Sequence, residues 1–207
     1  MSADSKRLKG FLLAVLVWLP LAFIGWAVLA PFIDYPPARL AGAMLSWFWP
    51  GLYHGVEFEG ASLSVISTLL VPQDGRVGQL VFSVDPMMYG YGLPLYVALA
   101  MATPLTFAQR VSQCVIAGLV VWLVQIAGIL SSALRLVAFD AGPVGQAAIA
   151  NHGLSPEVIA LCYQFSYLIL PAVLPAVVWV LLNRRFIEPL GRARAEPGAS
   201  ARGLSGE

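Results

Sequence analysis

The stretch VSQCVIAGLVVWLVQIAGILSSAL, residues 111–134, runs for 24 positions without a charged side chain. An α-helix rises about 1.5 Å per residue, so about 20 apolar residues cross the ~30 Å hydrocarbon core of a bilayer. The stretch is long enough, and it predicts a transmembrane helix. Three further uncharged runs, residues 11–30, 89–109 and 158–183, meet the same criterion.

The composition supports a membrane protein. The chain is 59% hydrophobic and 11% charged, with a mean hydropathy of +0.79, whereas a soluble domain carries roughly 25% charged residues. A net charge of +1 provides no field that would recruit nucleic acid. Cys114 and Cys162 are too few for a disulfide framework, and their spacing indicates no metal site. We therefore expect an all-α membrane protein with four transmembrane helices and without a metal or cofactor.

Two of the four runs raise questions of length or processing. Pro94 and Pro104 bracket the centre of run 89–109, and Pro104 can kink or end that helix. The first run exceeds the 7–15 apolar residues of a signal peptide, and Pro31 follows its best cleavage position. We expect it to remain as an anchor.

The basic residues predict the orientation. Nine of the twelve flank the runs on one side: Lys6, Arg7, Lys9, Arg110, Arg184, Arg185, Arg192, Arg194 and Arg202. Basic residues concentrate on the cytoplasmic side of membrane proteins, so we expect both termini in the cytoplasm. Tyr89, Tyr91 and Arg135 are then candidate anchors at the opposite interface, where aromatic and long basic side chains are favoured.

Residues 31–88 predict a small external α+β domain. A helix opens at Asp34-Tyr35-Pro36-Pro37 and carries Leu40, Met44, Trp47 and Phe48, which either lie on the outer leaflet or form part of the domain core. Alternating apolar residues at 56–58, 63–65 and 80–84 then predict three strands, with turns at Glu59–Ser62 and Gln73–Gly75. About 58 residues make a marginal core, so we expect this domain to lean on the membrane or a partner.

The predicted organisation is as follows. In chain order it comprises a cytoplasmic N-terminus (1–10), helix 1 (11–30), the external domain (31–88), helix 2 (89–109), helix 3 (111–134), an external loop (135–157), helix 4 (158–183) and a basic cytoplasmic tail (184–207).

One face of the third helix carries small and polar residues. They are Cys114, Gly118, Gln125, Gly128 and Ser132, at offsets of three, four and seven. Small residues let helices approach closely, and a polar group in a membrane prefers a bonded partner to lipid. We interpret the stripe as a seam for helix packing or for a partner. The alternative is that the stripe lines a substrate path. For the function of the whole protein, a small transport subunit that uses Gln125 and Gln164 in the membrane is a third hypothesis, after the two functions given below.

Several segments together resemble a known family. They are Trp18-Leu19-Pro20-Leu21, the strand Glu57–Leu63 with Ser67-Thr68, and the stretch Val84–Leu95, which contains the specific run Tyr-Gly-Tyr-Gly-Leu-Pro-Leu. Their order and layout over residues 10–185 resemble the exosortase H-associated membrane proteins. The resemblance implies a bacterial inner-membrane protein whose external domain is periplasmic. It implies an exosortase as partner, and possibly the C-terminal sorting tail of its substrates, besides membrane lipid.

We considered a cysteine enzyme beside this reading. Cys114, Arg135 and His152 follow the Cys, Arg, His order of exosortases, but 21 residues of helix would separate Cys114 from Arg135 by ~31 Å. A nucleophile and its base must come within about 3 Å. Cys162, His152 and Arg135 would share one side, so an intramembrane cysteine transpeptidase or protease using them is the alternative function. The favoured hypothesis is a non-enzymatic accessory subunit of a sorting system.

Overall fold

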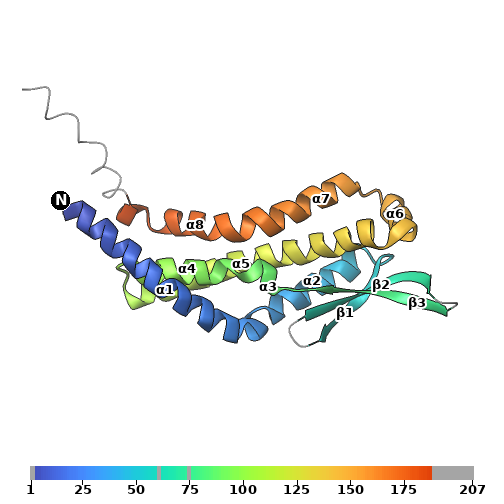
Figure 1. Cartoon of the computed structure of the whole chain (residues 1–207), viewed down its shortest axis with the longest axis horizontal. Helices are drawn as coiled ribbons and strands as arrows, with labels where there is room; N and C mark the ends of the chain where they lie inside the picture. The colour runs from blue at the N-terminus through green and yellow to red at the C-terminus, as the bar shows by residue number, and fades with distance from the viewer. Residues whose placement is uncertain (1–2, 60–61, 74–75, 188–207) are drawn as a thin grey trace, which may run out of the picture.

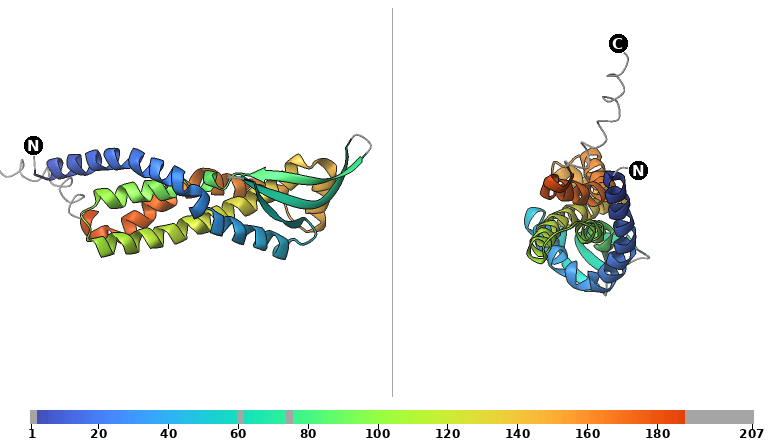
Figure 2. Two further views of the ribbon diagram at one scale, coloured as in Figure 1. Left: turned by 90° about the horizontal axis from the view of Figure 1, so that it is seen from below. Right: turned by 90° about the vertical axis from the view of Figure 1, so that its left-hand side faces the viewer.

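A computed structural model describes residues 3–59, 62–73 and 76–187, and it is mostly helical. The centres of both predicted hairpin turns, residues 60–61 and 74–75, lie outside these ranges. The tail from residue 188 also lies outside them. The molecule is elongated, with a helical bundle at one end and a small sheet at the other (Figure 1). The left view of Figure 2 shows the same division from below.

Three helical segments are long and apolar enough to cross a membrane. They are Leu8–Ile33 within α1 (Ala3–Ile33); Phe107–Asp140, which joins α5 (Phe107–Arg135) to the π-helical turn η1 (Leu136–Asp140); and Pro156–Leu182, which joins α7 (Pro156–Gln164), η2 (Phe165–Ile169) and α8 (Leu170–Leu182). These segments contain three of the four predicted runs, except for the last residue of run 158–183.

The run predicted as helix 2, residues 89–109, is not one long helix. It is divided between α3 (Met87–Gly90) and α4 (Gly92–Ala102), which together form a shorter apolar segment. Helix α4 ends before Thr103, whose backbone is extended (φ −84°, ψ 137°). Pro104 explains this ending, because a proline disfavours the helical conformation of the residue before it.

Helix α5 begins earlier than predicted because of a capping box. The Thr106 hydroxyl accepts a hydrogen bond from the Gln109 backbone, and the Gln109 side chain accepts one from the Thr106 backbone. This pair satisfies two free N–H groups of the first turn. Helix α7 starts in a related way, since Ser155 accepts a hydrogen bond from the Val158 N–H, as an N-cap residue does.

Helices α1 and α5 run in the same direction, and α8 runs opposite to both. At one end, Phe11 of α1 stacks on Trp179 of α8, and Gln113 of α5 is hydrogen-bonded to Asn183 after α8. Towards the other end, Asp34 directly after α1 is bonded to Gln125 of α5. Figure 1 shows the chain starting at the first of these ends, which we call the N-terminal end of the bundle.

The predicted three-stranded sheet is present. Strands β1 (Tyr53–Glu59), β2 (Ser62–Gln73) and β3 (Arg76–Val84) pair antiparallel in the order β1-β2-β3. Helix α2 (Tyr35–Phe48) precedes the sheet and packs along α5, and α6 (Gly142–Asn151) contacts β2. We call these five elements, together with residues 126–140, the sheet domain.

Helix α2 buries a mostly small face with one leucine, and leaves its aromatic residues exposed. Ala38, Ala41 and Leu45 are at most 1% exposed. Of the residues considered for a leaflet or core role, Leu40, Trp47 and Phe48 are exposed and Met44 is half-buried. The small face allows α2 to approach α5 closely, and its aromatic residues project from the sheet domain.

The two halves of α5 have different surroundings. In residues 126–135, the domain half, Ile126, Ile129 and Ala133 belong to the large core, which also contains residues of α2 and the sheet. In residues 107–123, the bundle half, large apolar side chains are exposed: Phe107, Val111, Val115, Ile116, Leu119 and Leu123. The core of the sheet domain therefore includes the end of α5 and does not depend on residues 31–88 alone.

Candidate functional site

A buried polar pair lies where α1, α3 and α5 meet. Gln125 is fully buried, and its Nε2 donates a hydrogen bond of 2.6 Å to Oδ1 of Asp34, which is 5% exposed. The same amide lies 3.5 Å from the carbonyl oxygen of Pro86. Asp34 Oδ2 and Gln125 Oε1 are buried without a partner in the described structure. The pair fixes the junction between the bundle and the sheet domain.

The electrostatics of Asp34 follow from this burial. Burial raises the pKa of its carboxyl group, because the charged form loses hydration. The hydrogen bond from Gln125 lowers the pKa in part, and the negative charge of Asp85 raises it further. The carboxyl group therefore binds a proton more readily here than in water.

The Tyr-Gly-Tyr-Gly segment forms the other side of this junction. A Cβ atom on Gly90 would lie 2.6 Å from Gln125 Nε2, and one on Gly92 would lie 2.6 Å from the Pro171 carbonyl oxygen on α8. Both distances are shorter than real Cβ contacts, so the two glycines allow α3 and α4 to approach α5 and α8. The segment thus has a packing role at each glycine.

Tyr89, one of the predicted interface anchors, is buried within the protein. It is 2% exposed, and its ring covers Gly128, where a Cβ atom would lie 2.2 Å from the ring. Its ring also meets that of Tyr167 edge-on at 6.5 Å. Tyr91 is half-buried. Tyr89 is therefore placed by the small residue opposite it.

The predicted seam divides between two environments. Gln125, Gly128 and Ser132 are buried by contacts within the chain. Cys114 and Gly118 instead line an apolar groove on the bundle half of α5, and no heavy atom lies within 4 Å of a Cβ placed on Gly118. The domain-side part of the stripe thus packs the protein's own elements, and the remainder is open.

A second polar network holds the N-terminal end of the bundle. The side-chain amides of Gln113 and Asn183 donate hydrogen bonds to each other at 3.3 and 3.1 Å. The Tyr96 hydroxyl also donates to Gln113, and Trp179 Nε1 donates to the Thr103 hydroxyl at 3.0 Å. Helices α4, α5 and α8 are linked there. Polar residues near the ends of the runs were the available sequence signal, but their pairing was not predictable.

The residues of the alternative cysteine enzyme do not form a catalytic arrangement in the described structure. Cys162 is exposed, and no hydrogen bond joins it to His152 among the described residues. His152 Nδ1 instead lies 2.9 Å from the Ala148 carbonyl oxygen of its own helix. Arg135 pairs with Asp140 at 3.1 Å and lies 5.4 Å from the centre of the Tyr163 ring. Arg135 and Cys114 lie at opposite ends of α5.

Metal ligands also do not gather. Within residues 3–59, 62–73 and 76–187, no three histidine, cysteine or acidic side chains are placed to hold a metal ion.

Comparison with known proteins identifies the family. Residues 5–186 match the family model described as exosortase H-associated membrane protein. No match was found among curated proteins or among solved structures. The match covers nearly all of the described chain, and the protein belongs to this family.

Proposed function

We propose that this member of the exosortase H-associated membrane protein family is a non-enzymatic accessory subunit. It binds an exosortase-type sorting enzyme, the C-terminal sorting tail of that enzyme's substrates, or both. The observation that carries the proposal is the family match over residues 5–186, because the family is described by its association with exosortase H.

The proposed topology has four crossings with both termini in the cytoplasm. Since α1 and α5 point the same way, the chain must return across the membrane between them, and α3 with α4 is the segment available. Residues 87–102 measure ~24 Å at 1.5 Å per residue, somewhat less than a ~30 Å hydrocarbon core. Local thinning of the bilayer accommodates such a short segment at modest cost.

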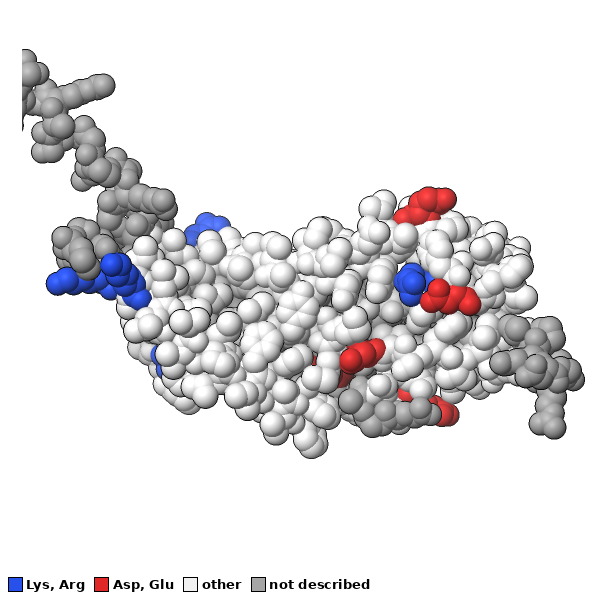
Figure 3. Space-filling view, in the orientation of Figure 1, with Lys and Arg blue, Asp and Glu red and all other residues white. Residues whose placement is uncertain are grey.

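Charge supports the proposed orientation in a bacterial inner membrane. Most of the lysine and arginine side chains in view lie at the N-terminal end of the bundle, and the acidic side chains lie over the other half, where one basic group is beside them (Figure 3). Lys9, Arg110 and Arg184 flank the helices at the first of these ends. The positive-inside rule assigns that end to the cytoplasm and the sheet domain to the periplasm.

The exposed face of α2 is the surface we propose for the sorting enzyme. Trp47 is 82% exposed, and its ring stacks on that of Phe48, which is 60% exposed. Leu40 adds to the same helix with 53% exposure. Large aromatic residues are enriched at protein interfaces, and an exposed apolar patch beside charged residues is typical of a binding site. A sorting tail could add to the free edge of β1 or β3.

Site-specific photo-crosslinking tests this proposal. Benzoylphenylalanine at Trp47 should crosslink to the co-expressed exosortase, whereas the same group at Leu123, which is 67% exposed on the bundle half, should crosslink to lipid. Replacing Cys162 by Ser should leave sorting unchanged. If the protein neither co-purifies with an exosortase nor crosslinks to it or to a sorting tail, the accessory role is wrong.

A further inference from the structure

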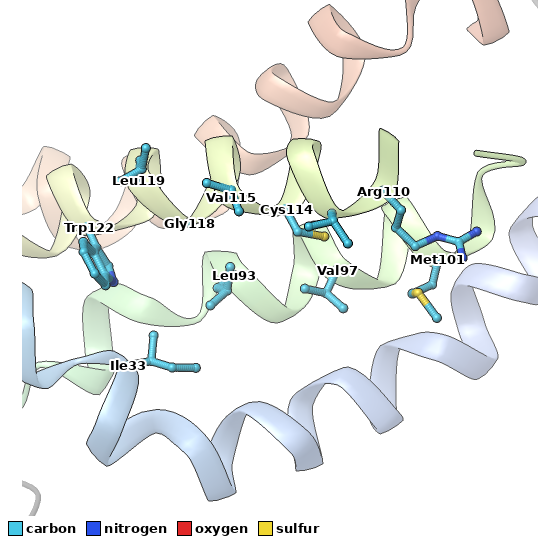
Figure 4. A pocket seen from close by; sticks show the side chains of 11 residues that line it. Ile33, Leu93, Val97, Met101, Arg110, Cys114, Val115, Gly118, Leu119 and Trp122 are labelled. Carbon is cyan, nitrogen blue, oxygen red and sulfur yellow. The ribbon is translucent and has the colours of Figure 1, made fainter. Parts of the chain in front are cut away.

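An apolar groove opens between α1, α4 and α5. Its volume is about 580 Å³. Leu93, Val97 and Met101 of α4 line its floor, and Val115 and Leu119 of α5 form one wall (Figure 4). Gly118 widens the groove at the middle of this wall, because it has no side chain and no atom lies within 4 Å of the position that its Cβ would take.

The length of the groove matches one leaflet and not a whole bilayer. It extends from Arg110 to Trp122, ~18 Å along α5 at 1.5 Å per residue. Half of a ~30 Å hydrocarbon core is about 15 Å. Trp122 and Ile33 lie at the far end of the groove (Figure 4). A transmembrane helix of a partner would need a surface about twice as long, whereas one acyl chain fits.

The near end of the groove carries a single charged group. Arg110 is the one charged residue of the lining. Its Nε atom is buried without a partner, and its Nη2 donates only a long 3.5 Å hydrogen bond to the Thr103 carbonyl oxygen. No acidic side chain pairs with Arg110 within the described part of the chain. The guanidinium therefore retains donors that suit a phosphate, which it binds in a two-pronged geometry.

We propose that this groove binds one anionic phospholipid, with an acyl chain along α4 and α5 and the phosphate on Arg110. The occupant comes from the leaflet at the N-terminal end of the bundle. Only the naming of that leaflet as cytoplasmic rests on the proposed topology. Lipid binding itself is independent of any sorting partner, so the accessory role and the lipid site can fail separately.

Native mass spectrometry of the purified full chain tests the site. With phosphatidylglycerol as probe, the wild type should retain one tightly bound lipid, and with phosphatidylethanolamine it should bind more weakly. Arg110→Gln should weaken phosphatidylglycerol binding about tenfold, because a charge-assisted hydrogen bond is lost. Lys9→Gln, which removes an exposed charge at the same end, is the matched control and should bind as the wild type does.

Filling the groove provides an independent test. Gly118→Trp should abolish retention of both lipids, while size-exclusion chromatography shows a folded monodisperse protein. If Gly118→Trp fails to fold, Arg110→Lys provides the second test. It keeps the positive charge but loses the two-pronged guanidinium geometry, so its affinity for phosphatidylglycerol should lie between those of the wild type and Arg110→Gln. Equal losses in Arg110→Gln and Lys9→Gln would overturn the proposal. The proposal would also be overturned if benzoylphenylalanine placed at Leu119 crosslinked to another protein and not to a phospholipid.

Discussion

The two halves of α5 are similarly apolar in sequence but face opposite surroundings. In the domain half, Ile129 is fully buried by the protein's own α2 and sheet domain core. In the bundle half, Leu119 is 55% exposed. The apolar face of the bundle half therefore needs hydrocarbon around it, whereas the domain half already has a protein core. Hydropathy alone registers both as membrane-spanning, and only the packing distinguishes them.

Truncating one large side chain in each half should reveal this difference most strongly. Ile129→Ala should lower the free energy of unfolding by about 2–5 kcal/mol, because it leaves a cavity in a packed core. Leu119→Ala removes a side chain that faces lipid, and we expect a loss below about 1 kcal/mol. Unfolding by SDS in bicelles measures both. Similar losses in the two variants would remove the distinction between the halves.

The polar groups of the two halves should also differ. Gln125→Leu leaves the buried Asp34 carboxylate without its donor, and loss of a hydrogen bond to a charged group costs about 1.5–3 kcal/mol. Tyr96→Phe removes one neutral hydrogen bond, from the Tyr96 hydroxyl to Gln113 in the bundle half, at about 0.5–1.5 kcal/mol. The same unfolding assay ranks the two variants, and a larger effect at Tyr96 would contradict the junction's importance.

Glycine-to-alanine changes make a sharper pair, since both add one methyl group to the same helix. At Gly128 the new Cβ would lie 2.2 Å from the Tyr89 ring, and such overpacking typically costs about 1–3 kcal/mol. At Gly118 the space is open, so the better helix propensity of alanine should stabilise by up to about 1 kcal/mol. Thermal unfolding of the two purified variants should therefore shift in opposite directions.

The smallest expected effect is a dependence on pH at the junction. Burial raises the pKa of Asp34 above its ordinary value of 3.8, so the folded state binds the proton more tightly than the unfolded chain. This group's contribution makes stability fall as pH rises from about 3.8 through the raised pKa, and it is constant above that. Asp34→Asn should remove this contribution. An unchanged pH profile in the variant would exclude Asp34 as its source.

The sequence predicted elements better than it predicted their contacts. Three of the four long apolar runs and the alternating strands depend on local patterns, and these have counterparts in the structure. The start of α5 was predictable in principle from Thr106 and Gln109, whose spacing is that of a capping box. The predicted helix started at residue 111 instead, because the uncharged run begins only after Arg110.

The contacts at the candidate site were beyond a reading of the sequence. The sequence marks Gln125 as a polar residue in need of a partner, but Asp34 lies 91 positions away, in the segment predicted as the external domain. The small residues of the seam indicated close packing without revealing that Tyr89 covers Gly128. Such pairings depend on how the helices cross, which periodicity within one helix does not determine.

The depth of α5 in the bilayer tests the central claim most directly. Spin labels at Leu119→Cys and Phe139→Cys, in nanodiscs and with Cys114 and Cys162 replaced by Ala, report collisions with oxygen, which concentrates in lipid, and with a water-soluble nickel chelate. Both native side chains are partly exposed, so the labels should be tolerated. We expect oxygen to dominate at position 119 and the nickel chelate at position 139. Oxygen dominating at both positions would place the domain half inside the membrane and contradict the account.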